Sequence, residues 1–136
     1  MLTQKYINDI AFQIVGCAIE VNKNVGPGLL ESVYELCLMD ELKSKNLKTN
    51  SQVRVPVLYK GKDLGGHLII DLLVEDLVVV ELKSVEALQP IFEAQILSYM
   101  MLTDKPKGLL INFNTTNIVA STRHFVTDIF SHLPKS

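Results

Sequence analysis

The sequence is short of several features that define whole classes of protein. Its two cysteines, Cys17 and Cys37, sit among apolar residues in helix-like sequence, with no CxxC pair. This excludes a disulfide framework or a cysteine-based zinc site and favours a reducing compartment. No run approaches the ~20 apolar residues of a membrane-spanning helix. The opening "MLTQKYINDIAFQIVG" lacks the basic segment and apolar stretch of a secretory signal, so we expect a cytoplasmic protein with no membrane partner.

Arginine is scarce as well. Of the 13 basic residues only Arg54 and Arg123 are arginines, and the net charge is -2. This balance argues against a protein that grips nucleic acid by bulk charge alone. Two lysine clusters stay open as local phosphate contacts, or simply as solvated lysines at a helix end and in a turn: Lys43, Lys45 and Lys48, and Lys60 with Lys62.

What the chain does have is a clear alternation of periodicities. A length of 136 residues fits one domain spanning 1–136. Apolar residues recur at helical spacing in 4–21 and 29–45, then at strand spacing from residue 51 onward. We expect strands in "SQVRVPVLYKG", "HLIIDLLV" and "VVVELKSV", with Pro56 marking a sheet edge. A helix over 90–103, strands in "KGLLINF" and "NIVASTRHF" and a last helix in "VTDIFSHL" complete an α-α-β-β-β-α-β-β-α order. This order predicts an α/β (α+β) fold with helices flanking a mixed sheet.

The run "IIDLLVEDLVVVELKSV", residues 69–85, places charges inside strand sequence built for burial. Glu81 and Lys83 are two apart and share a face of their strand, while Asp71 lies on the preceding strand. Buried carboxylates must be paired, hydrated or bound to a metal. Two interpretations follow: a cross-strand salt bridge from Lys83 to an acid, or a site for a hard cation such as Mg²⁺. In the second, Lys83 helps to activate a water.

Strand geometry gives the metal interpretation a condition. If Glu75 and Asp76 formed a two-residue turn, Asp71 would lie opposite Val80, on the face away from Glu81. A loop with an odd number of residues, such as "EDL", or a bulge brings Asp71 opposite Glu81. We predict the second arrangement.

Two helical segments add polar groups at useful spacing. In "GLLESVYE", Glu31 and Tyr34 are three apart on one helix face. The simpler role of Glu31 is a favourable interaction with the helix dipole in the first turn. In "FEAQILSYM", Gln95 and Tyr99 are four apart and follow the strand that carries Glu81 and Lys83.

These segments together resemble a known family. "GLLESVYE" fits the GxxExxY pattern that names a group of small bacterial and archaeal proteins. "IDLLVEDLVVVELKSVEAL", "FEAQILSYM" and "GLLINF" follow in the family's order, so the resemblance spans about residues 5–115. The family is placed in the PD-(D/E)XK nuclease-like superfamily, which implies a restriction-endonuclease-like α-β-β-β-α-β core.

The resemblance also implies roles for single residues. Asp71 and Glu81 would be metal ligands, with the Leu82 carbonyl and Glu31 completing the metal shell. Lys83 would position or activate the attacking water, and Gln95 would order the site. Tyr34 and Tyr99 are the expected substrate contacts. Relatives often carry an arginine two residues before the strand aspartate, where this chain has Ile69; His67 could replace it only from the same face.

Two functions of different classes follow. The leading hypothesis is Mg²⁺-dependent hydrolysis of nucleic acid, DNA favoured, with Mn²⁺ as a possible substitute and a homodimer as a possible assembly. The alternative is a catalytically inactive nucleic-acid-binding or protein-interaction module that retains the nuclease fold. An ion-pair network of Asp71, Glu81 and Lys83 is the purely structural interpretation.

Overall fold

The computed structural model describes all residues from 1 to 136. In chain order its elements are α1 (Gln4–Val25), α2 (Glu31–Ser44), β1 (Thr49–Tyr59), β2 (Lys62–Val74), β3 (Val78–Lys83), α3 (Pro90–Leu102), β4 (Lys107–Asn112), α4 (Ile118–Ser121), β5 (Thr122–Val126) and α5 (Asp128–Ser131). The order matches the one expected from the sequence, except that "NIVASTRHF" divides into the short helix α4 and the strand β5.

The strands form one mixed sheet in the order β1-β2-β3-β4-β5. β1, β2 and β3 are an antiparallel meander, β4 runs parallel to β3, and β5 is antiparallel to β4. The parallel pair is joined through α3, because parallel strands need a long crossover connection. This arrangement confirms the predicted α-β-β-β-α-β core and the restriction-endonuclease-like fold.

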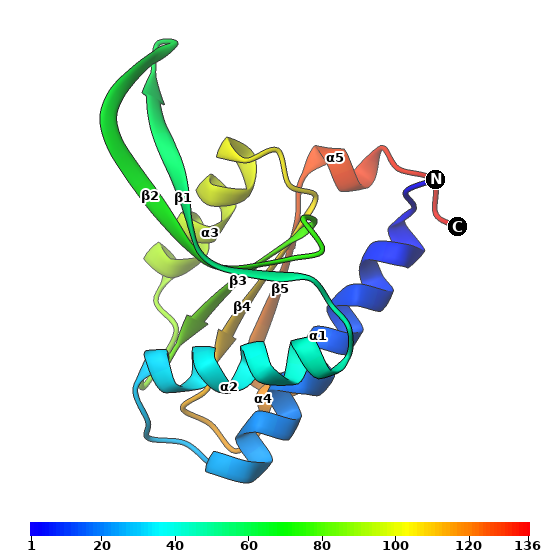
Figure 1. Ribbon diagram of the computed structural model, residues 1–136, viewed down its shortest axis with the longest axis vertical. Helices are drawn as coiled ribbons and strands as arrows, with labels where there is room; N and C mark the ends of the chain where they lie inside the picture. The colour runs from blue at the N-terminus through cyan, green and yellow to red at the C-terminus, as the bar shows by residue number, and fades with distance from the viewer.

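Helices cover both faces of the sheet (Figure 1). α1 and α2 pack on one face, where the larger core joins their apolar stripes to the inward residues of β3 and β4. α3 covers the other face through a smaller core that includes Ile96, Tyr99 and Met100. The termini lie close together, since the backbone N–H of Gln4 donates to the Pro134 carbonyl at 2.8 Å. None of the helices combines the length and the apolar character that crossing a membrane would require.

The turn between β2 and β3 sets the register that the candidate site depends on. Val74 pairs with Val78, so Glu75, Asp76 and Leu77 form the loop between the paired strands. Glu75 and Asp76 both adopt left-handed backbone conformations, with φ of 53° and 56°. The odd loop predicted from "EDL" is therefore confirmed.

β1 and the outer part of β2 form a long two-stranded arm that projects beyond the rest of the molecule (Figure 1). Its strands remain paired out to Tyr59 and Lys62, so β2 begins well before the strand predicted in "HLIIDLLV". Pro56 lies on the edge strand β1, as predicted, next to a register shift between Pro56 and Leu58. Proline is tolerated there because an edge strand leaves half of its N–H groups unpaired.

One glycine lets α3 lie close to the sheet. A Cβ atom built on Gly108 of β4 would stand 2.5 Å from the Met100 sulfur and 3.2 Å from Ile96 Cδ1. A side chain at this position would displace the side chains of Met100 and Ile96. The glycine therefore allows close packing of the helix that carries Gln95 and Tyr99.

Candidate active site

The candidate site lies where β2 separates from β3. The ladder between them covers Leu72 to Val74 and ends at the Leu72–Val80 pair, so Asp71 and Glu81 occupy the next opposed position. Here hydrogen bonds from backbone N–H groups to the two carboxylates take the place of backbone-to-backbone bonds. The backbone N–H of Asp71 donates to Glu81 Oε2 at 2.7 Å, and that of Leu82 donates to Asp71 Oδ2 at 2.9 Å. Each carboxylate thus sits at the end of a strand pair, held by the backbone of the opposite strand.

The surroundings of both carboxylates disfavour their ionised forms. Glu81 is only 6% exposed, and burial together with the nearby charge of Asp71 raises its pKa to about 8. Burial also raises the pKa of Asp71, against the lowering effect of the Leu82 N–H and the charge of Lys83. Two acids that resist ionisation side by side are a common sign of a functional site. A divalent cation is the partner that would relieve both.

A cavity of about 330 Å³ opens beside Asp71, between α2 and the sheet. Its walls include Glu31 as the sequence predicted, together with Glu35 and Gln52, which the sequence analysis missed. Burial is the largest cause that raises the pKa of Glu35, with the charge of Asp71 adding to it. A signal for Glu35 was present: it lies one helical turn after Glu31, so both acids face the same way.

Gln52 links the helix to the strand acids. Its side-chain amide donates to Glu35 Oε1 at 2.8 Å, and it lowers the pKa of Asp71 by hydrogen bonding. Gln52 falls opposite Asp71 in the β1–β2 register and has a left-handed φ of 50°. A non-glycine residue in that region costs about 1–3 kcal/mol, a strain often stored at functional sites. Nothing in the sequence indicated this conformation.

Lys83 does not form the cross-strand salt bridge that was one interpretation of the sequence. The two ion pairs of the structure join Lys5 to Asp9 and Lys105 to Asp76, both away from this site. The Lys83 ammonium instead lies 4.4 Å from the centre of the Phe92 ring. An ammonium group is attracted to an aromatic face, so this contact holds Lys83 near the acids without an ion pair to either of them.

Gln95 and Tyr99 of α3 approach the site from the other face of the sheet. The Gln95 amide donates to the Tyr99 hydroxyl at 2.9 Å. The pKa of Tyr99 is raised by burial first and then by the negative charge of Glu81. Tyr99 is 8% exposed, so its accessible part is small. The structure therefore brings both residues to the Glu81 side, as expected from the sequence.

Tyr34, expected to contact substrate, is fully buried and its position corrects that expectation. Its ring stacks on Phe113 with centroids 4.7 Å apart. Its hydroxyl donates to the Gly26 carbonyl at 2.6 Å and accepts from the Leu29 N–H at 3.1 Å. The side chain therefore fixes the loop before α2, and with it the helix start that bears Glu31. The spacing could not show this, because tyrosine suits both a core and a surface.

Ile69, at the position where an arginine was expected from the resemblance, has a basic residue opposite it on the neighbouring strand. Ile69 pairs directly with Arg54 of β1, and Pro56 pairs with His67. Opposed residues of an antiparallel pair share a face, so Arg54 lies beside the position where relatives carry an arginine. His67 also shares that face, since it lies two residues from Ile69.

The donor set suits a divalent cation, although no three ligating side chains stand close enough to hold one alone. The expected group of Asp71, Glu81 and Glu31 is thus not assembled: Glu31 lines the cavity but does not join the other two. Asp71 and Glu81 each accept one backbone N–H and have no basic side chain within ion-pair distance. Mg²⁺ commonly binds through one or two carboxylates and keeps several waters. The residues therefore fit a divalent cation that takes few protein ligands better than a metal that needs a full protein cage.

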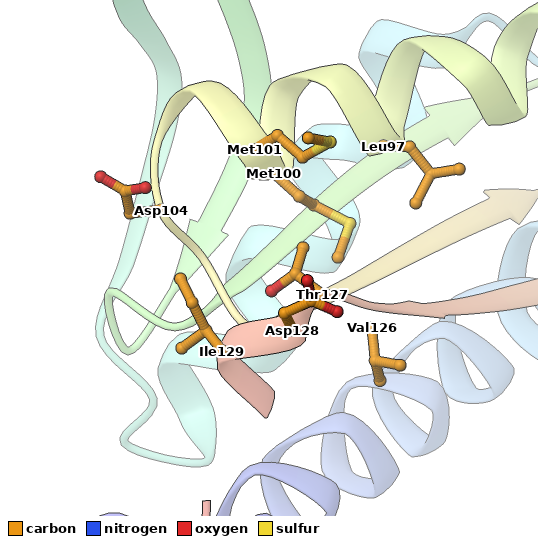
Figure 2. A pocket seen from close by; sticks show the side chains of 8 residues that line it. All are labelled: Leu97, Met100, Met101, Asp104, Val126, Thr127, Asp128 and Ile129. Atoms are coloured by element: carbon orange, nitrogen blue, oxygen red, sulfur yellow. The ribbon is translucent and has the colours of Figure 1, made fainter. Parts of the chain in front are cut away.

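A second cavity, about 350 Å³, lies between α3 and the segment from β5 to α5. Figure 2 shows Leu97, Met100, Met101, Val126 and Ile129 around it, with two aspartates on the wall. It contains neither Asp71 nor Glu81 and none of the residues that hydrogen bond to them. Its two aspartates are exposed and no group of metal-ligating side chains gathers there, so it is not the candidate active site.

Comparison with known proteins gives an answer consistent with this geometry. No curated protein and no solved structure matches the chain. Residues 8–125, however, match the PD-(D/E)XK nuclease superfamily. That range runs from within α1 to within β5 and includes both acids at the end of the β2–β3 ladder. With most of the chain matched and the expected core in place, the protein belongs to the PD-(D/E)XK nuclease superfamily.

Proposed function

We propose that the protein is a divalent-metal-dependent phosphodiesterase that hydrolyses nucleic acid, with DNA favoured. The observation that supports this most directly is the pairing of Asp71 and Glu81 at the end of the β2–β3 ladder, which we call the fork. Asp71 and Glu81 are brought together by the backbone of two separating strands, and no basic side chain neutralises them. Natural proteins rarely bury a pair of acids in this way without a functional reason.

Asp71, Glu81 and the Leu82 carbonyl would hold Mg²⁺ or Mn²⁺, while Glu31 of α2 faces the same cavity without joining the ligands. When bound, such an ion supplies Lewis acidity and lowers the pKa of nearby water. These side chains otherwise define an anionic wall around the site, which a phosphate can approach only when its charge is compensated.

Lys83 is the group of this chain best placed to act on the attacking water and on developing phosphate charge. Its ammonium is held over the Phe92 ring at 4.4 Å, and its strand neighbour two residues before is Glu81. A preorganised cation at the point where negative charge develops is a main source of rate enhancement. Gln95, hydrogen bonded to Tyr99, would position the site from α3.

The test is cleavage of a substrate panel by the purified protein. Plasmid, branched and single-stranded DNA, with matching RNA, are incubated with Mg²⁺ or Mn²⁺ and compared with the Glu81→Ala variant. Glu20→Ala, an exposed acid on α1, controls for loss of one charge. We expect cleavage that needs a metal, survives Glu20→Ala and disappears in Glu81→Ala. Cleavage that persists without Glu81 would point to a contaminant or a different site.

A non-catalytic module is supported by one observation, the absence of a complete three-residue ligand group. Calorimetry separates the two functions. A nuclease should bind Mn²⁺ with one site that requires Asp71 and Glu81. A module that has lost the chemistry should show no such binding and no cleavage, yet should retain a partner.

A further inference from the structure

The two-stranded arm has no role in the candidate site as described so far. Beyond the Gln52–Asp71 position its strands pair from Val53 and Ile70 out to Tyr59 and Lys62. At about 3.3 Å per residue this is a ribbon ~20 Å long, and it projects clear of the body (Figure 1). One side of its base packs toward α3 through Val53, Val55, Leu68 and Ile70. The other side is open.

Charge is divided sharply between the arm and the site at its base. The arm carries four exposed basic or titratable side chains, Arg54, Lys60, Lys62 and His67. Its one acid, Asp63, is engaged in the turn, where it accepts the Gly65 N–H at 2.9 Å. The site at its base is lined instead by carboxylates. A polyanion that reaches those carboxylates needs cations close by, and the arm supplies them.

The shape of the arm also selects among nucleic acids. The major groove of B-form DNA, about 12 Å wide, admits a two-stranded β-ribbon. The major groove of an RNA duplex is too narrow for protein side chains to read. The tip presents Leu58, Tyr59 and Leu64, which are 56%, 58% and 61% exposed. Apolar groups of this kind suit contact with thymine methyls in the major groove.

We propose that the arm binds duplex DNA by lying in its major groove next to the scissile phosphate. This deepens the proposed function, on which it rests, by naming the substrate class and the element that holds it. Arg54, the basic residue of the arm nearest to Asp71 along the ladder, contacts the backbone beside the site. Lys60 and Lys62 contact phosphates farther along, at the tip.

A second copy of the chain is the competing occupant, because β1 is an edge strand. Edge-to-edge pairing requires a regular row of free N–H and C=O groups. Pro56 lacks the N–H, and the register shift between Pro56 and Leu58 bends the edge. Two arms would also bring like charges together. These features favour DNA over a partner arm.

The test measures binding without cleavage. Fluorescence anisotropy in EDTA compares a labelled DNA duplex with an RNA duplex of the same sequence. The arm variant is Arg54→Ala/Lys60→Ala/Lys62→Ala. Its matched control, Lys43→Ala/Lys45→Ala/Lys48→Ala, removes the same charge from exposed lysines at and beyond the end of α2. A tip variant, Lys60→Ala/Lys62→Ala, leaves Arg54 within β1 untouched and guards against misfolding.

We expect the arm variant to weaken DNA binding at least tenfold and the α2-end variant to change it less than threefold. Each lost phosphate contact should reduce the slope of log affinity against log salt by about 0.9, so the arm variant loses about 2 to 3 and the tip variant up to 2. The wild type should prefer the DNA duplex to the RNA duplex. A further sign of groove binding is that Leu58→Ser/Leu64→Ser weakens binding without altering the salt slope.

Several results would overturn the proposal. Equal losses in both triple variants would mean that bulk charge accounts for the binding. Equal affinity for the DNA and the RNA duplex would rule out binding in the major groove. An arm variant that turns a dimer into a monomer in sedimentation, with DNA binding intact, would assign the arm to a second copy. Failure of the proposed function looks different: arm-dependent DNA binding would persist, but no cleavage would depend on Glu81.

Discussion

Two cavities of nearly equal volume, about 350 and 330 Å³, show how little size says about function. The apolar cavity, between α3 and the β5–α5 segment, is walled by methionine, leucine, valine and isoleucine (Figure 2). Its acids, Asp104 and Asp128, are exposed. The acidic cavity, beside Asp71, is walled mainly by polar side chains from α2, β1 and β2. Hydrophobic lining is the usual guide to a ligand site, yet here the chemistry gathers in the other cavity.

The difference arises from how each carboxylate is held. An exposed acid on a helix end keeps its water and has little free energy to exchange with a ligand. Glu81 has lost its water and received one backbone N–H in return. A cation that binds there compensates for the unfavourable burial of the Glu81 carboxylate, which is already present in the metal-free fold. The contrast can therefore be tested by making the same substitution in both cavities.

The largest expected effect comes from Asp71→Asn set against Asp104→Asn. Each substitution removes one negative charge with little change in shape. Asp71→Asn should abolish measurable Mn²⁺ binding in calorimetry and reduce cleavage by about 10²–10³-fold or more, the usual scale for losing one stabilising group at a reaction centre. Asp104→Asn should leave both unchanged. Equal effects would show that total charge, and not the fork, attracts the ion.

The second prediction concerns stability against pH in the metal-free protein. The pKa of Glu81 rises from an ordinary 4.5 to about 8 in the folded state. Between these values the folded state binds more protons than the unfolded state, so the free energy of unfolding should fall as pH rises from about 4.5 through 8. Asp71, whose pKa is also raised, acts in the same direction.

The fall should amount to roughly a few kcal/mol, measured by urea unfolding in EDTA at several pH values. Glu81→Gln should flatten the profile and be more stable than the wild type above pH 8. Saturating Mn²⁺ should restore wild-type stability there, since a ligand of the native state stabilises it. A profile that is already flat in the wild type would show that Glu81 ionises freely.

The third prediction tests the packing of α3, which lines the apolar cavity and carries Gln95 and Tyr99. Gly108→Ala forces a Cβ against Met100 and Ile96 and should lower the free energy of unfolding by about 1–3 kcal/mol, as overpacking does. Because α3 also carries Gln95 and Tyr99, metal-dependent cleavage should fall as well. Gly16→Ala on α1 is the matched control, since a Cβ there would meet no atom within 4 Å.

Periodicity predicted most of the fold, because burial of one face repeats apolar residues about every 3.6 positions in a helix and every two positions in a strand. It also predicted the opposition of Asp71 and Glu81, since strand parity and an odd loop are properties of the local sequence. It missed Gln52, whose left-handed backbone depends on packing between β1, β2 and α2. It misplaced Tyr34, because tyrosine is found both in cores and at surfaces. It missed the length of the arm, because the strand predicted in "HLIIDLLV" begins after the residues of β2 that form the outer part of the arm.

The smallest effect contrasts two neighbours on α3. Gln95 donates to the Tyr99 hydroxyl near Glu81, whereas Leu97 lines the apolar cavity. A neutral hydrogen bond contributes about 0.5–1.5 kcal/mol, which corresponds to a two- to tenfold change in rate. Gln95→Ala should therefore lower the rate of cleavage by that factor, and Leu97→Ala should leave it unchanged. If Leu97→Ala slowed cleavage as much as Gln95→Ala, α3 would act on the site through its overall packing, and the two cavities would be one coupled unit.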